Sequence, residues 1–309
     1  MNRHQTSPYT EDLRLAHMIA DSVDAQTMAR FSAMDFDVET KPDLTPVTEA
    51  DRLAEELIRG QLSRARGRDA VHGEEFGSSG SGPRRWVIDP IDGTKNFVRG
   101  VPVWATLIAL VDHGEPVMGV VSAPALGRRW WAARDGGAYT GKSLASARPL
   151  EVSKVSALSD ASFSYSSLTG WRAAGRSQNF LELTETVWRT RAFGDFWSYC
   201  LLAEGAVDLA AEPELELHDM AALVPIVTEA GGQFTSLDEE PGCSGGNALA
   251  TNGLLHQAAL AALAPDDPTP WANPSAAAPS AAAEDAPQGA PTPQEAAQHE
   301  AGRTGLSPS

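Results

Sequence analysis

The chain has 309 residues and a formal net charge of −17, with 42% hydrophobic and 21% charged residues. This length allows one large domain or two packed ones, and the apolar content is enough for a substantial core. The acidic charge argues against a nucleic-acid partner, because proteins that bind nucleic-acid phosphates present a basic surface.

Cellular context follows from what the sequence lacks. No apolar run approaches the roughly 20 residues that a membrane helix needs, and the polar N-terminus has no apolar signal core. The two cysteines, Cys200 and Cys243, are too few for a disulfide framework. We therefore expect a cytoplasmic protein with no membrane partner.

The first predicted element is an amphipathic helix over residues 10–23, with Met18 and Ile19 on its core-facing stripe. Residues 36–40 alternate between polar and apolar and predict a strand. The two prolines within 41–46 then indicate a loop.

A second amphipathic helix is predicted over residues 47–62, with Asp51 in its first turn, where an acid stabilises the helix dipole. Residues 70–75 predict a short strand that ends in a pair of glutamates. Such a pair is usually solvated, but Glu74 follows a glycine that permits close backbone approach. The Gly-Ser-rich stretch 77–82 suggests a mobile flap.

The most informative stretch follows. Residues 86–88 predict a buried strand that stops at Asp89-Pro90, because proline donates nothing to a sheet. Asp92 comes three residues after Asp89, and Gly93 and Thr94 could begin a helix with free N–H groups. Two neighbouring acids raise each other's pKa unless a cation joins them. This combination suits hard metal ions and a phosphate.

The remaining pattern divides the chain. Strands are predicted at 105–111, 116–123, 128–133 and 138–139, so residues 1–150 form an α+β half with a mostly antiparallel sheet. Helices and strands alternate over 151–264, which predicts an α/β half. Residues 265–309 are rich in Pro and Ala and poor in large apolar residues, which predicts a disordered tail.

More acids lie in the second half. Asp219 opens a predicted apolar helix over 218–230, where a simple N-cap and a metal ligand are both open interpretations. Glu212, Glu214 and Glu216 precede it, and by spacing alone they could be a solvated acidic loop.

The residues Asp89-Pro90-Ile91-Asp92-Gly93-Thr94 with Asn96-Phe97 resemble the signature of the inositol monophosphatase superfamily of magnesium-dependent phosphatases. The run from Lys95 to Trp104 resembles the actinobacterial histidinol-phosphate phosphatase branch. The resemblance covers residues 10–264 and implies a layered αβαβα sandwich, often a homodimer. A small-molecule phosphate ester is the implied substrate.

The resemblance also assigns roles to residues at matching positions. It implies two or three Mg²⁺ ions, with Mn²⁺ possible, held by Glu74, Asp89, the Ile91 carbonyl, Asp92 and Asp219. It implies phosphate binding by the N–H groups of Gly93 and Thr94, and catalytic roles for Asp51, Glu74 and Thr94 around the attacking water. His218 stands where the family usually has tryptophan, and we expect it outside the ligand set.

The implied reaction is hydrolysis of L-histidinol phosphate to L-histidinol and phosphate, in histidine biosynthesis. An inositol-1-monophosphatase or another small sugar or nucleotide phosphatase is the alternative within the family, and an inactive metal-binding regulatory homologue is the alternative outside it. A cationic substrate needs acids beyond the metal ligands, for which Asp195 and Glu216 are the preferred candidates. Arg191 is a candidate wall or inter-subunit residue.

Overall fold

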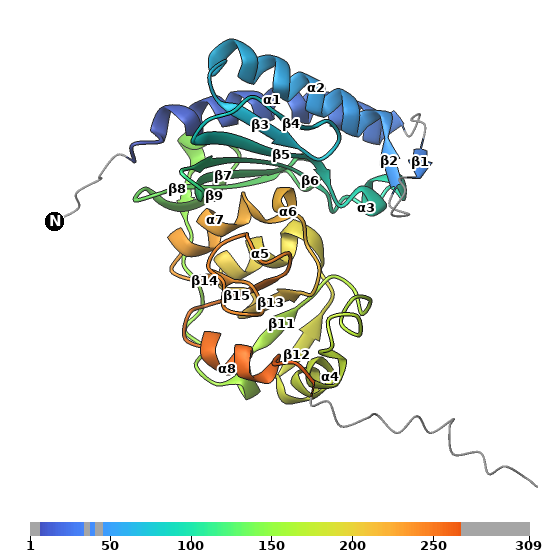
Figure 1. Ribbon diagram of the computed structural model, residues 1–309, viewed down its shortest axis with the longest axis vertical. Coiled ribbons are helices and arrows are strands. Elements are labelled where there is room, and N and C mark those ends of the chain that lie inside the picture. The colour runs from blue at the N-terminus through green and yellow to red at the C-terminus, as the bar shows by residue number, and fades with distance from the viewer. Residues whose placement is uncertain (1–6, 34–37, 41–45, 267–309) are drawn as a thin grey trace, which may run out of the picture. The chain divides into compact units, whose positions relative to one another are not determined.

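The computed structural model describes residues 7–33, 38–40 and 46–266. In this part of the chain, two helices, an eight-stranded sheet, a middle group of helices, a five-stranded sheet and two outer helices follow one another as layers (Figure 1). The expected αβαβα sandwich is confirmed. Parts of three predictions lie outside the described residues. They are the start of the predicted strand (36–37), most of the predicted loop (41–45) and the predicted tail from 267 onward.

The first sheet has the spatial order β10-β9-β8-β7-β6-β5-β3-β4, and all its pairs are antiparallel except β3 with β5. Its strands are β3 (Ala70–Gly73), β4 (Gly77–Ser79), β5 (Arg84–Asp92), β6 (Ala105–Asp112), β7 (Glu115–Ala123), β8 (Arg128–Ala133), β9 (Gly137–Gly141) and β10 (Arg148–Pro149). A separate antiparallel pair is formed by β1 (Val38–Thr40) and β2 (Pro46–Thr48). The predicted antiparallel first half is confirmed.

Two details of this sheet correct the sequence predictions. Residues 77–79 of the Gly-Ser stretch expected to be a mobile flap form β4, which pairs with β3 in a hairpin with Gly73 opposite Gly77, whereas residues 80–82 are irregular. In addition, β5 does not stop at Pro90 but continues to Asp92, with a register shift against β6 between Asp89 and Asp92. Proline is tolerated there because an irregular position needs no ladder donor.

The helices α1 (Thr10–Ala33) and α2 (Glu49–Ala65) cover one face of the first sheet. Ile19 and Ile58 are fully buried in the cluster that joins them to the strands. Met18, expected on the same stripe, is 59% exposed, because one helical step of about 100° turns it away from Ile19.

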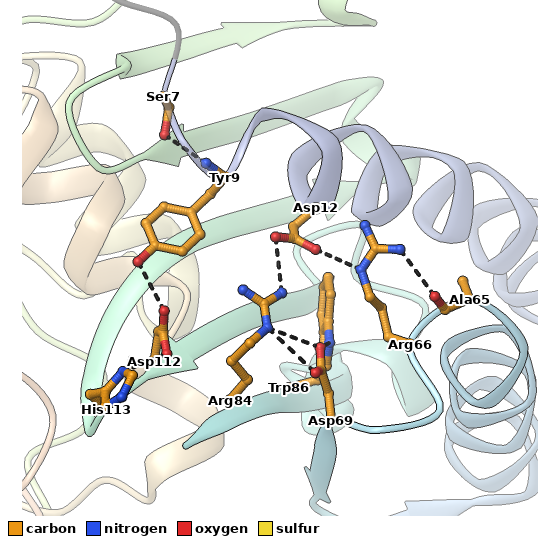
Figure 2. A network of polar contacts seen from close by, with 10 residues as sticks. All are labelled: Ser7, Tyr9, Asp12, Ala65, Arg66, Asp69, Arg84, Trp86, Asp112 and His113. Atoms are coloured by element: carbon orange, nitrogen blue, oxygen red, sulfur yellow. Dashed lines mark hydrogen bonds and ion pairs between the residues drawn. The ribbon is translucent and has the colours of Figure 1, made fainter. Parts of the chain in front are cut away.

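A polar network fixes these helices to the first part of β5 (Figure 2). The Asp12 carboxylate of α1 accepts hydrogen bonds from Arg66 Nε, just after α2, and pairs with Arg84 of β5. Asp69 accepts from Arg84 and from the Trp86 indole N–H at 3.0 Å. Each acid thus connects two elements, so the helix layer has a fixed position on β5.

The second sheet has the order β12-β11-β13-β15-β14, with parallel β11–β12 and β11–β13 pairs and antiparallel pairs for the other neighbours. Its strands are β11 (Ser162–Ser164), β12 (Arg189–Arg191), β13 (Leu209–Glu212), β14 (Gln233–Thr235) and β15 (Ala248–Thr251). The helices α5 (Asp195–Ala203), α6 (Leu217–Met220) and α7 (Leu223–Glu229) lie between the sheets, and α4 (Ser177–Thr186) and α8 (His256–Ala262) lie outside the second sheet.

Short segments complete the described chain. They are α3 (Thr94–Val98) and the 3₁₀ turns η1 (Pro124–Leu126), η2 (Leu144–Ser146) and η3 (Leu158–Asp160). No helix in the described ranges is both long and apolar enough to cross a membrane. Asp266, which was predicted to be in the disordered tail, is held in place, since its carboxylate accepts from the N–H groups of Gln178 and Asn179 at the start of α4.

The predicted helix over 218–230 is divided into α6 and α7. Pro225 accounts for the break, because a proline ring clashes with the carbonyl four residues earlier, here that of Ala221. Next to the break, Gly119 of β7 lies against the main chain: a Cβ built on Gly119 would sit 2.1 Å from the Ala222 carbonyl oxygen. A side chain at 119 would therefore push α6 and α7 off the first sheet.

Candidate active site

A cavity of about 670 Å³ opens where the end of β5 faces α5 and α6. Most of the predicted site residues line it: Glu74, Asp89, Ile91, Asp92, Gly93, Thr94, Asp195, Glu216 and Asp219. Asp51 is fully buried behind the wall. Arg191 is exposed and does not line the cavity, so within the described chain its predicted wall contact is not made.

Three aspartates from two distant segments meet in this cavity. Oxygen atoms of Asp89, Asp92 and Asp219 all lie within 4.8 Å of one another. Residues three apart on a regular strand point to opposite faces, and the irregularity in β5 lets both Asp89 and Asp92 line the cavity. Asp219 is the third residue of α6, not its N-cap, and accepts from the Glu216 N–H at 2.7 Å.

A second group shares Asp89 and contains a histidine. Ligand atoms of Glu74, Asp89 and His218 also lie within 4.8 Å of one another. Glu74 is placed by the turn after β3, where its N–H donates to the Ile88 carbonyl. His218, which was expected outside the ligand set, is part of this group, and its position beside Asp219 at a helix start was the available signal.

The charges of this cluster fit a divalent cation. Burial, then the neighbouring carboxylates of Glu74, Asp92 and Asp219, raise the pKa of Asp89 well above its usual value. One Asp89 oxygen is buried and has no hydrogen-bond partner among the described residues. Carboxylates held this close bind either protons or a cation, and their hard oxygen atoms are the ligands of Mg²⁺ or Mn²⁺.

Asp51 connects the helix layer to the cavity. Its Oδ2 accepts from the N–H and hydroxyl of Thr48 at the start of α2, at 2.8 and 2.5 Å. Its Oδ1 lies 3.4 Å from the Thr94 hydroxyl, which is also 3.0 Å from the Ile91 carbonyl. Burial raises the pKa of Asp51 to about 7, and the Thr48 hydrogen bonds oppose that rise. The Thr94 hydroxyl therefore lies beside a carboxyl group, that of Asp51, which can take up or release a proton near neutral pH.

Gly93 forms the turn into α3 with φ of +84°. A Cβ at this position would sit 3.0 Å from the Val103 carbonyl oxygen and 3.4 Å from Asp195 Oδ2. Glycine is thus required by both conformation and space. The same geometry places Asp195 directly over the turn predicted to hold phosphate.

Asp195 begins α5 in a left-handed conformation, with φ of +48°. Its Oδ2 accepts from the Asn96 amide at 3.3 Å and its Oδ1 from the Ser166 hydroxyl at 3.4 Å. Burial raises the pKa of Asp195, whereas Ser166 and Lys95 act in the opposite direction. The next N–H group, of Phe196, donates to Asp92 Oδ2 at 2.7 Å. This turn therefore presents one acid to the cavity and orients another.

The remaining acids differ in depth. Glu212 is buried at the end of β13, and burial, followed by the charge of Asp195, raises its pKa well above its usual value. Glu214 and Glu216 are exposed at the rim. The acidic segment before α6 thus contains one buried acid, Glu212, and two solvent-exposed acids at the rim of the cavity.

Comparisons with known proteins agree with this geometry. Residues 10–268 match the model of the inositol monophosphatase family. A histidinol-phosphatase of Streptomyces coelicolor is 69% identical over 82% of this chain and 96% of the relative. A histidinol-phosphatase of Mycobacterium tuberculosis is 58% identical over 82% and 98%. The structure of an inositol monophosphatase from Zymomonas mobilis superposes with a TM-score of 0.71 at 33% identity, covering 83% of this chain and 99% of that one.

Proposed function

The chain belongs to the inositol monophosphatase family and is a phosphoric monoester hydrolase, and from that premise we propose that its substrate is L-histidinol phosphate. The observation that carries this choice of substrate is the presence of Asp195, Glu212 and Glu216 in the same cavity as the cluster of Asp89, Asp92 and Asp219. Such a cluster serves an ester whose phosphoryl oxygens and attacking water need a positive charge nearby.

We propose Mg²⁺ as the ion, held by Glu74, Asp89, Asp92, Asp219 and the Ile91 carbonyl, with two or three ions at each site. When bound, these ions would stabilise charge on the phosphoryl oxygens and lower the pKa of a water molecule. The chain's own part is to orient the reactants: the Thr94 hydroxyl, next to Asp51, would align the attacking water and accept or pass on its proton. The N–H groups of Gly93 and Thr94 would hold the phosphate.

The substrate assignment is supported by acids beyond the metal groups. Histidinol phosphate carries an ammonium and an imidazole at its non-phosphate end. Asp195 lies over the turn at Gly93, and Glu212 and Glu216 line the same cavity. Two relatives at 69% and 58% identity are histidinol-phosphatases. A cationic group held near Asp195 would lie close to the phosphate, as the length of this ester requires.

The proposal includes the setting of the enzyme. We propose a homodimer, supported by Trp188, which is 67% exposed and directly precedes the edge strand β12. A cytoplasmic location agrees with Cys200 and Cys243 being buried and unpaired. Arg191, on that same edge strand, remains a candidate inter-subunit residue, and the division at residue 150 lies between the two sheets.

The test is a substrate panel with released phosphate as the readout. Histidinol phosphate should exceed inositol 1-phosphate in kcat/KM by about 100-fold or more, since a buried acid left without its cationic partner costs several kcal/mol. Comparable rates for both esters would make the enzyme a general phosphatase of the family. No hydrolysis of either would favour the inactive regulatory homologue.

A further inference from the structure

One buried acid near the site belongs to neither metal group and does not line the cavity. Glu55 lies on α2, one turn after Asp51, and is fully buried. Its carboxylate accepts hydrogen bonds from the N–H groups of Glu75 and Phe76, at 2.7 and 3.3 Å, and from Arg59 Nε at 2.7 Å. The charge of a buried carboxylate is satisfied by several such donors and an ion pair.

The turn whose N–H groups donate these hydrogen bonds also carries Glu74. Its main chain lies directly on the carboxylate, because a Cβ built on Gly73 would sit 2.0 Å from Glu55 Oε1. No residue with a side chain fits at 73 unless Glu55 moves. Glu74 therefore lies between Gly73, whose main chain packs on Glu55, and two N–H groups that donate hydrogen bonds to Glu55.

Arg59 extends the contact to the second strand of the hairpin. Its guanidinium donates to the Gly77 carbonyl and to the Ser79 hydroxyl, the latter at 3.0 Å. Arg59 thus connects the carboxylate of Glu55 to β4. Together, Glu55 and Arg59 contact the β3–β4 hairpin before and after its turn. The Glu74 N–H is separately tied to β5.

We propose that Glu55, oriented by Arg59, is a positioning residue that fixes the turn carrying Glu74 and thereby sets the affinity of the metal site to which Glu74 contributes. The inference rests on the proposed function, in which Glu74 binds a divalent cation. A partner that orients a ligand from behind typically changes metal affinity by about 10- to 100-fold when it is altered. Glu55→Gln would remove the charge that pairs with Arg59. The N–H groups of the new side-chain amide would also face the main-chain N–H groups of the turn, which need an acceptor.

The experiment uses the full chain, stripped of metal and titrated with Mg²⁺ in a calorimeter. Glu55→Gln should raise the Kd for Mg²⁺ about 10-fold or more. The matched control is Glu56→Gln, one residue along the same helix and exposed, which should leave the Kd unchanged. In the metal-free protein, the amides of Glu75 and Phe76 should exchange hydrogen faster in Glu55→Gln than in the parent.

Each outcome decides the proposal. An unchanged Kd in Glu55→Gln, with or without faster exchange, overturns it. If Glu55→Gln does not fold, Arg59→Ala replaces it, since Arg59 is partly exposed, and the same rise in Kd is required. If the parent chain itself binds no Mg²⁺, the proposed function fails; if the parent binds and Glu55→Gln binds equally well, only the role of Glu55 fails.

Discussion

The two sides of the cavity hold their acids in different ways. On the side of the first sheet, Asp51 and Asp89 are 0% and 2% exposed, and both sit in fixed hydrogen-bond or charge clusters. On the side of the second sheet, Asp219 joins the cluster that contains Asp89. Asp195 and Glu212 lie in the cavity, whereas Glu214 and Glu216 are exposed at its rim. We therefore expect the acids of the first side, together with Asp219, to act on every phosphate ester, and the other acids of the second side to choose among esters.

The largest effect on every ester is expected from a substitution of Asp89, on the first side of the cavity. Asp89→Asn should lower kcat/KM by about 10³-fold for every ester tried, because loss of charge stabilisation by a metal removes several kcal/mol at about 1.4 kcal/mol per tenfold. Phosphate release measures the effect, with the exposed Asp160→Asn as the control. Activity within tenfold of the parent, in a variant with an unchanged melting temperature, would contradict the role of the first side.

The far face of the first sheet offers a contrast, since it also buries ionisable groups but borders no site. Arg129 pairs there with Asp21 and Asp24 and donates to His17. Burial, followed by the charge of Arg129, lowers the pKa of His17 to about 4, and Asp21 opposes this. In the unfolded chain the pKa of this histidine is near 6.5, so between pH 6.5 and 4 the unfolded state binds a proton that the folded state does not. The stability present above pH 6.5 is therefore lost as the pH falls towards 4.

For His17 we therefore expect the free energy of unfolding to fall by about 3 kcal/mol between pH 6.5 and 4, beyond the effects of other groups. Burial also raises the pKa of Asp24, which has the opposite effect on stability as the pH falls. The measurement is urea unfolding of the parent and His17→Gln across this range, because the difference between them isolates His17. Parallel pH profiles would refute the prediction.

On the second side, Asp195 should carry the larger part of selectivity. Asp195→Asn should lower kcat/KM for histidinol phosphate about 30-fold, since removing one partner of a desolvated charge pair costs about 2 kcal/mol or more. Asparagine keeps the left-handed backbone that Asp195 adopts. Hydrolysis of an aryl phosphate that carries no cationic group should change little, and equal losses on both esters would show that Asp195 does not select the substrate.

Glu216 should have the smallest effect, because it is exposed and screened by solvent. Glu216→Gln should raise KM for histidinol phosphate by about 2- to 5-fold, corresponding to at most about 1 kcal/mol, and the difference should shrink at high salt. Glu214→Gln is the neighbouring control at the same rim. A KM change that is equal for aryl phosphate would remove Glu216 from substrate recognition.

Much of this arrangement could be read from the sequence. The motif around Asp89 and Asp92 identified the family, and the acid at 219 was correctly brought to the same site. The strand β6 was predicted because it is a short unbroken apolar run, buried at seven of its eight positions, and α2 was predicted because its apolar residues recur at helical spacing.

What could not be read depends on contacts between distant segments. The passage of β5 through Pro90 follows from its pairing with β6, where the Thr106 hydroxyl binds the Pro90 carbonyl. The position of His218 within a ligand group depends on where α6 meets β5. Glu55 looked like any acid of a helix, and only its contact with the turn after Gly73 separates it from Glu56.

The approach of Gly119 to Ala222 constrains how the enzyme can exchange its ligands. Main chain meets main chain there, so no side chain can rotate to separate β7 from the segment between α6 and α7. The surrounding cluster of buried apolar residues would have to open to water for such a separation. We therefore expect the ester to enter, and phosphate to leave, past the exposed residues Glu214 and Glu216 at the rim of the cavity.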